Sequence, residues 1–179
     1  TGEPAHREAA MTVRLLREFL EAGIEPVSAL RTLNAALMLR GEEGGGFTTI
    51  DLLALQRPTG AGTLYKYGAA PSYLKRGGCV TRVTGQSLPA GLQQGADGPE
   101  STRLSLPAGS FFVMVSDGVA DETDDEWLQN LMAGWSGQSA EALASLILSE
   151  SRTRRGLRDD CAVLVLHLPK MEDSPPRQV

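Results

Sequence analysis

The spacing of the hydrophobic positions changes near residue 46, and this change separates a helical part of the chain from a part rich in strands. From Pro4 to about residue 22, apolar side chains recur every three or four positions, which is the period of an amphipathic helix, and Gly23 supplies a stop. Pro26 opens a second stretch with leucines at the same spacing. The pattern therefore predicts a helical hairpin over residues 1–40.

Beyond residue 46, short apolar runs alternate with breakers rich in glycine and proline, which is typical of consecutive strands. The strands up to residue 83 should form an antiparallel meander. Two helices, many strands, two more helices and a final strand together indicate a layered α+β fold. We predict strands over residues 47–55, 63–67, 72–75, 79–83, 103–106 and 111–115, helices over residues 124–132 and 140–150, and a last strand that contains Cys161.

Composition and charge narrow the class of protein. At 179 residues and 41% hydrophobic, the chain can bury one core of single-domain size. The formal net charge of −5 argues against a nucleic-acid surface, which needs a basic face. No apolar run reaches the ~18 to 20 residues of a membrane span, so we expect no membrane contact by these residues. Only Cys79 and Cys161 are present, so no disulfide framework is indicated and a cytoplasmic location is expected.

Acidic residues flank two apolar strands in the second half of the chain. Asp117 and Gly118 follow the run at residues 111–115, whereas Asp159 and Asp160 come just before the last strand. If these strands lie antiparallel in one sheet, the end of one and the start of the other fall on the same rim. Carboxylate oxygens suit Mg²⁺ or Mn²⁺, and clustered carboxylates repel one another unless a cation compensates. Together the acids favour a metal site, although each pair alone is also ordinary for a turn.

Other candidate chemistry is weaker. His167 lies six residues from Cys161, about 20 Å along an extended strand, which excludes a Cys/His dyad, and the second histidine, His6, falls on the first helix. Residues 41–46 are rich in glycine but lack the Gly-Lys-Ser/Thr of a phosphate loop, so a linker is favoured. Residues 68–72 are either a plain connection, which we favour, or a loop that faces substrate.

A group of arginines precedes the second acidic pair. A positive cluster beside a metal site could attract a phosphoryl group, whereas the alternative is a solvated basic loop that balances nearby acids. We favour the loop. The residues concerned are Arg152, Arg154, Arg155 and Arg158.

Several short motifs, in their order and spacing, resemble those of the PPM-type metal-dependent serine/threonine protein phosphatases. Two of them carry the acids: Ser116-Asp117-Gly118-Val119 and, further along, Arg158-Asp159-Asp160-Cys161. Three more are similar to the bacterial branch typified by stage II sporulation protein E: Phe47-Thr48-Thr49-Ile50-Asp51, Tyr67-Gly68-Ala69-Ala70-Pro71-Ser72 with the residues up to Gly77, and Ser87-Leu88-Pro89-Ala90-Gly91. Nearly the whole chain takes part in the resemblance.

This resemblance implies an antiparallel β-sandwich flanked by helices, with two Mn²⁺ or Mg²⁺ ions at one end. It also implies that a water held between the ions attacks the phosphorus of a phosphoserine in line, without a covalent enzyme intermediate. Asp117 would be a catalytic metal ligand and Asp159 the closing one, with Gly118 and Asp160 beside them in the metal site. The alternation of side chains along a strand should turn Asp160 away from Asp159.

The start of the chain has its own counterpart in the family. Residues 1–8 resemble the segment that directly follows the family's Asp-Gly-Met-Gly metal motif, so the first metal-binding aspartate and the first strands would lie before Thr1. We therefore expect residues 1–168 to be one partial phosphatase domain of a longer protein, with residues 169–179 as a tail.

By the same resemblance, the substrate would be a phosphorylated anti-sigma-factor antagonist. The hairpin from Pro4 to Arg40 would be a switch that couples partner binding, or formation of a homodimer, to metal binding. The parent protein could carry an upstream membrane region, with this domain on the cytoplasmic side. The alternative is a catalytically inactive, phosphatase-like module that binds a partner through the hairpin.

Overall fold

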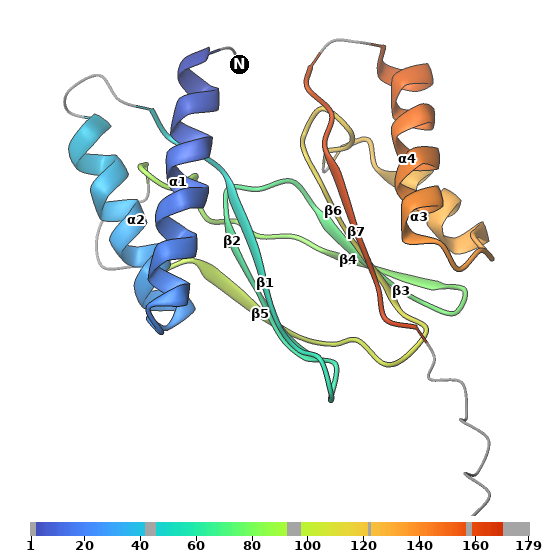
Figure 1. The fold of residues 1–179 in the computed structure, drawn as a ribbon. Coiled ribbons are helices and arrows are strands. Elements are labelled where there is room, and N and C mark those ends of the chain that lie inside the picture. Colours follow the sequence, from blue (N-terminus) through green and yellow to red (C-terminus); the bar gives the residue numbers. More distant parts are fainter. Residues whose placement is uncertain (1–2, 42–45, 93–97, 122, 157–158, 170–179) are drawn as a thin grey trace, which may run out of the picture. The chain divides into compact units, whose positions relative to one another are not determined.

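A computed structural model describes residues 3–41, 46–92, 98–121, 123–156 and 159–169 (Figure 1). Both predicted pairs of helices and the predicted strands are present, and the fold is mixed α+β with antiparallel pairing, as the sequence predicts. In chain order the elements are α1 (Glu3–Glu21), α2 (Pro26–Gly41), β1 (Ile50–Gln56), β2 (Ala61–Tyr67), β3 (Ser72–Arg76), β4 (Cys79–Val83), β5 (Glu100–Ser105), β6 (Phe111–Val115), α3 (Glu126–Gly134), α4 (Ala140–Arg155) and β7 (Val163–His167).

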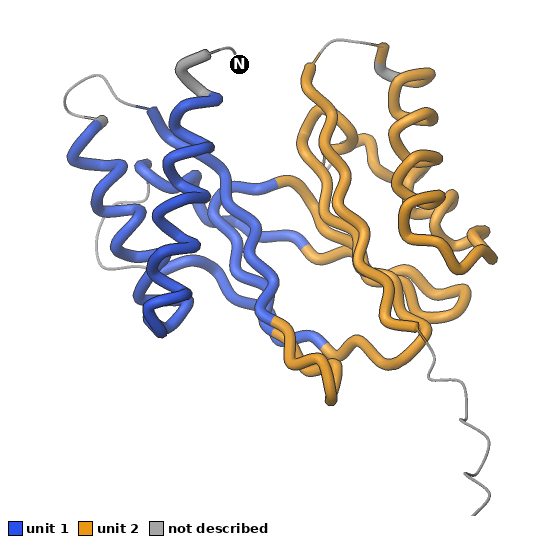
Figure 2. The backbone as a smooth tube through the Cα atoms, viewed as in Figure 1, with its two compact units in different colours: residues 1–54, 63–69, 84–104 blue, residues 55–62, 70–83, 105–179 orange. Residues whose placement is uncertain are grey.

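The chain divides into two compact units, each with its own hydrophobic core (Figure 2). Residues 1–54, 63–69 and 84–104 form the first unit, and residues 55–62, 70–83 and 105–179 form the second. The single domain over residues 1–168 stays a prediction. The expected tail falls, from residue 170 on, outside the described residues.

The first unit packs the helical hairpin on the three-stranded sheet β1-β2-β5. Leu30 and Leu37 of α2 are buried in one cluster with Ile50 of β1, Tyr67 of β2 and Ala90. In Figure 1, α1 and α2 lie on the same side of this sheet. The leucine spacing that predicts the second helix is therefore also the spacing that fills this core.

Two ion pairs fasten the first unit. The Nζ atom of Lys66 on β2 lies 2.7 and 2.9 Å from the two carboxylate oxygens of Asp51 on β1, and Lys66 is buried. Arg40 of α2 donates a hydrogen bond of 2.9 Å to Glu8 of α1. The ion pair of Lys66 and Asp51 links β1 and β2. A shift of one strand against the other would separate the pair and leave a buried charge without its partner.

The second unit is built on a four-stranded antiparallel sheet in the order β4-β3-β6-β7. Phe111, Val113 and Val115 of β6 are buried in one cluster with Leu128 of α3 and Ile147 of α4. Figure 1 shows both helices along one face of this sheet. Since side chains alternate along a strand, every second residue of β6 contributes to this core.

The predicted meander over residues 47–83 is wrong in one respect. β1 and β2 belong to the sheet that contains β5, whereas β3 and β4 belong to the sheet that contains β6 and β7. Residues 68–72 connect the two sheets. At Gly68 φ is +57°, and an added Cβ atom would lie 2.5 Å from the nitrogen of Pro89, so this connection turns where only glycine fits. The sequence pattern predicts the individual strands, but it does not show to which sheet each pair of strands belongs.

A buried polar network joins the sheet of the second unit to α3. The hydroxyl of Tyr73 donates to Asp125 at 2.9 Å, and Arg82 and Gln129 donate to the same carboxylate at 3.2 and 3.0 Å. Burial, followed by the hydrogen bond to Asp125, raises the pKa of Tyr73 well above its ordinary value, so its hydroxyl remains a donor throughout the physiological range.

Replacing Tyr73 by Phe is expected to lower the free energy of unfolding by about 1 to 2 kcal/mol, because the buried carboxylate of Asp125 loses a donor. Tyr65→Phe is the matched control: Tyr65 is a strand tyrosine that is only partly buried, and its hydroxyl makes no hydrogen bond with the described residues. Urea titration measures both variants. Equal midpoints for the two would contradict a stabilising role for this network.

Candidate metal-binding active site

The antiparallel pairing of β6 with β7 brings the predicted acids together. Val115, the last residue of β6, pairs with Val163, the first residue of β7. Asp117 and Asp159 lie just beyond these ends, and both line one cavity of about 700 Å³. The expectation that the two carboxylates share a rim is therefore confirmed. Their roles as metal ligands stay a prediction.

Ser116 links the two acidic turns through hydrogen bonds. Its backbone N–H donates to the carbonyl oxygen of Ala162 at 3.0 Å. Its hydroxyl accepts from the Ala162 N–H at 2.9 Å and donates to the carbonyl oxygen of Asp160 at 3.1 Å. The side chain thus extends the ladder of β6 and β7 past the end of the strands, and it fixes the backbone on both sides of the cavity.

Gly118 packs directly on the segment that carries the second acidic pair. An added Cβ atom would lie 2.5 Å from the carbonyl oxygen of Asp160 and 3.4 Å from the Cβ of Asp159. The Gly118 N–H donates to Asp117 at 3.1 Å, and the Asp160 N–H donates to Asp159 at 2.8 Å. Each carboxylate is therefore held by the backbone of the residue that follows it. Among the described residues, Asp159 lines the cavity and Asp160 does not, as the alternation rule leads one to expect.

Two further aspartates that sequence reasoning missed line the same cavity. Asp121 and Asp124 follow Asp117 in a turn in which the Ala120 N–H bonds back to the Ser116 carbonyl. One oxygen of Asp121 accepts from the Thr123 N–H and hydroxyl at 2.9 and 2.6 Å. Residues 117–121 form neither helix nor strand, so no periodic pattern in the sequence points to these two aspartates.

The arginines predicted to lie on a loop belong to α4 as far as Arg155, so the loop is wrong, whereas Arg152 and Arg154 are exposed to solvent as expected. This helix continues to Arg155, beyond the predicted end at residue 150, and stops where Gly156 has a φ of +69°. Arg154 lines the acidic cavity, lies 3.6 Å from Glu150 and has its guanidinium 5.4 Å from the centre of the Trp127 ring. The side chain of Arg155 and all of Arg158 fall outside the described residues.

The chemistry of this cavity fits a hard divalent cation. Its polar side chains are the carboxylates of Asp117, Asp121, Asp124 and Asp159 and the guanidinium of Arg154, with no histidine or cysteine among the described lining residues. No three such carboxylates in the described part of the chain are arranged to hold an ion by themselves. They supply oxygen donors for Mg²⁺ or Mn²⁺, which keep waters as ligands, without completing a coordination shell.

Cys161 and His167 lie apart, as expected. The Cys161 thiol donates to the carbonyl oxygen of Gly118 at 3.3 Å, at the acidic end of β7. His167 stacks on Phe111 at the other end of the strand, with 4.1 Å between ring centres. This excludes a Cys/His dyad within the described residues.

Comparison with known proteins connects this geometry to a family. A family model described as stage II sporulation protein E (SpoIIE) matches residues 1–169. The chain belongs to this family. SpoIIE of Bacillus subtilis (strain 168) is 33% identical over 174 residues, which cover 93% of this chain and 21% of that protein. The chain thus spans about a fifth of the length of this curated SpoIIE relative.

Two solved structures show which part of SpoIIE is similar. The structure of the B. subtilis SpoIIE PP2C phosphatase domain with a fragment of its regulatory domain has a TM-score of 0.78 and 30% identity, covering 89% of this chain and 50% of that chain. A manganese-presoaked structure of the same phosphatase domain has a TM-score of 0.63 and 30% identity, covering 89% and 72%. The PPM-type resemblance and the α+β fold are therefore confirmed, and the part of SpoIIE that this chain matches is the PP2C-type phosphatase domain.

Proposed function

We propose that this SpoIIE family chain forms the metal-binding rim of an enzyme that hydrolyses phosphoserine on a bacterial regulatory protein with Mn²⁺ or Mg²⁺. The observation that carries the proposal is the convergence of Asp117 and Asp159 on one acidic cavity at the ends of β6 and β7. Support for the metal comes from the donor set, which is made of carboxylates, and from the manganese-presoaked SpoIIE phosphatase domain.

The chain's own residues would prepare the site for hydrolysis. Asp117 and Asp159 supply negative oxygens, while Ser116 and Gly118 hold the two turns that carry them. A divalent cation bound there lowers the pKa of a coordinated water and neutralises charge on phosphoryl oxygens. The resemblance to PPM-type phosphatases supports direct attack by water on phosphorus, without a covalent enzyme intermediate.

The finer proposal names the substrate as a phosphorylated anti-sigma-factor antagonist and the hairpin of α1 and α2 as a regulatory or homodimer contact. The family membership supports the first part. For the second part, the contact would cover Val13 of α1 and Leu39 of α2, which are 57% and 67% exposed. Among the described residues, no helix is both long and apolar enough to cross a bilayer.

Release of inorganic phosphate from a phosphoserine peptide tests the proposal. The full-length protein should release phosphate in the presence of Mn²⁺ or Mg²⁺, and EDTA should stop the reaction until the metal is restored. A full-length protein that binds the phosphorylated partner but releases no phosphate with either metal would favour the alternative, an inactive module that acts through the hairpin.

A further inference from the structure

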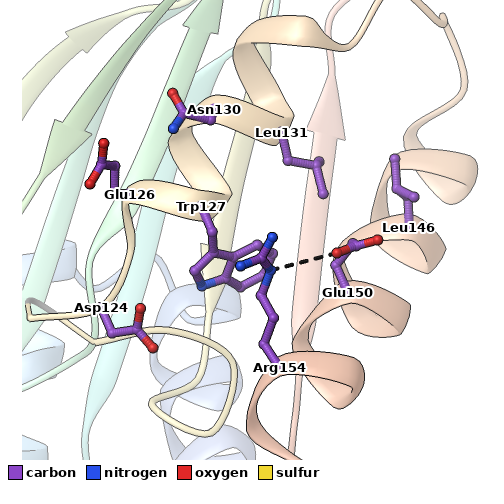
Figure 3. Close-up of a pocket in the computed structure, with 8 residues that line it drawn as sticks. All are labelled: Asp124, Glu126, Trp127, Asn130, Leu131, Leu146, Glu150 and Arg154. Carbon is purple, nitrogen blue, oxygen red and sulfur yellow. Dashed lines mark ion pairs between the residues drawn. The ribbon is translucent and has the colours of Figure 1, made fainter.

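A second cavity lies beside the acidic one, between α3 and α4. Its volume is about 690 Å³. Figure 3 shows that its residues come from the turn before α3, from α3 itself and from α4. We call it the α3–α4 groove.

The groove adjoins the candidate active site. Asp124 and Arg154 line both cavities. A phosphoserine with its phosphate in the acidic cavity belongs to a chain that must leave that cavity, and each extended residue covers about 3.3 to 3.6 Å. The residues next to the phosphoserine are therefore within reach of the groove.

The walls of the groove combine negative charge with apolar surface. Glu126 of α3 and Glu150 of α4 are among its lining residues, and Leu131 and Leu146 form part of its apolar lining. Trp127 lies beneath the guanidinium of Arg154 in Figure 3. Arg154 is already engaged by Glu150, at 3.6 Å, and by the indole ring. With Arg154 and Glu150 paired to each other, Asp124 and Glu126 leave the groove with net negative charge beside its apolar surface, which complements a basic residue beside an apolar one.

We propose that the α3–α4 groove binds the segment of the phosphoprotein next to the phosphoserine and selects a basic side chain with an apolar neighbour. This inference rests on the proposed phosphatase function and adds to it a determinant of substrate specificity. Arg154 marks the boundary: the phosphoryl group lies on one side of it and the flanking residues on the other.

Binding of non-hydrolysable peptides tests the groove separately from catalysis. Fluorescent peptides carry a phosphonate analogue of phosphoserine, with Lys-Leu or Glu-Leu placed either before or after it. Fluorescence anisotropy with the full-length protein and Mn²⁺ gives each Kd. In at least one of the two placements, the Lys-Leu peptide should bind more tightly than the Glu-Leu peptide.

Glu126→Lys reverses one charge of the groove, and Glu141→Lys is its matched control. Both glutamates are exposed and lie in the first turn of a helix, but Glu141 does not line the groove. Glu126→Lys should weaken binding of the Lys-Leu peptide by about threefold to tenfold and reduce the preference over Glu-Leu, whereas Glu141→Lys should leave both unchanged. Leu146→Asn, on the opposite helix, should weaken both peptides without changing that preference.

The outcomes separate the two proposals. Equal affinity of the wild-type protein for Lys-Leu and Glu-Leu peptides, or equal effects of Glu126→Lys and Glu141→Lys, would overturn the inference. Hydrolysis of a small aryl phosphate, which has no flanking residues, reports on the phosphatase function alone and should be the same in all three variants. If the wild-type protein does not hydrolyse the aryl phosphate, the proposed phosphatase function is contradicted. The peptide affinities still test whether the groove selects the flanking residues.

Discussion

Replacement of Asp117 or of Asp159 by Asn is expected to lower Mn²⁺-dependent phosphate release by about 100-fold or more. Each substitution removes one negatively charged oxygen donor from the acidic cavity. Asn keeps the shape of the side chain and removes its charge. The loss should appear in the turnover rate at saturating substrate, and more Mn²⁺ should be needed for half of the remaining activity.

Asp160→Asn is the matched control for this prediction. Asp160 is the neighbour of Asp159 and carries the same charge, but it does not line the cavity in the described structure. Its replacement should therefore change phosphate release by no more than about threefold, the size of a typical effect of one exposed charge. An Asp160→Asn variant as inactive as Asp159→Asn would mean that net charge, rather than placement in the cavity, is what matters.

Thermal unfolding without metal distinguishes loss of chemistry from loss of fold. Four carboxylates share the cavity, and clustered like charges repel one another when no cation compensates. The Asp117→Asn and Asp159→Asn variants should therefore unfold at the same temperature as the wild type, or slightly higher, in EDTA. Added Mn²⁺ should raise the unfolding temperature of the wild type by more than that of either variant, because a ligand stabilises the state that binds it.

The meeting of the two acidic segments could be predicted once antiparallel pairing of their two strands was assumed. The apolar runs at residues 111–115 and 163–167 each have the length of a buried strand, and antiparallel pairing puts the end of one beside the start of the other. The predicted separation of Asp159 from Asp160 is also observed, although both residues precede β7 and are not part of the strand. The assumption that these two strands are neighbours is confirmed by the structure and not by the sequence pattern.

The division of the strands between two sheets could not be predicted in this way. β2 and β3 are separated by a short glycine- and proline-containing segment, and such a segment suits a hairpin as well as a passage to another sheet. Pairing of β3 with β6, which is far away in sequence, decides between them. That pairing is a long-range contact, and local patterns carry little information about it.

The end of α4 and the place of Arg154 show a different limit. The polar residues 149–155 lack the apolar spacing that marks a helix face, so the pattern predicts an end near residue 150. The helix continues because arginine, serine and glutamate are acceptable helix formers and because Ser151 is fully buried, with its hydroxyl 3.4 Å from the Val119 carbonyl. Local propensity permits the additional turn, and the tertiary contact of Ser151 accompanies it, so Arg154 reaches the acidic cavity.

The second large effect is expected for Gly118→Ala. A methyl group at this position would lie 2.5 Å from the carbonyl oxygen of Asp160, and that oxygen belongs to backbone rather than to a side chain that could swing away. The segment of Asp159 and Asp160 must then move from the turn that carries Asp117. We expect a loss of about 1 to 3 kcal/mol in the free energy of unfolding, as for other overpacked sites, measured by urea titration.

Gly134→Ala separates this steric effect from the general effect of replacing glycine. Gly134 ends α3, and an added Cβ atom there would meet nothing within 4 Å, so the change should be neutral or slightly stabilising through helix propensity. For Gly118→Ala, displacement of Asp159 should also raise the Mn²⁺ concentration for half-maximal phosphate release by about tenfold, since disturbed support of a metal ligand typically costs that much. A Gly118→Ala variant that is destabilised yet keeps the Mn²⁺ dependence of the wild type would show that this close contact supports the fold and does not position the two carboxylates.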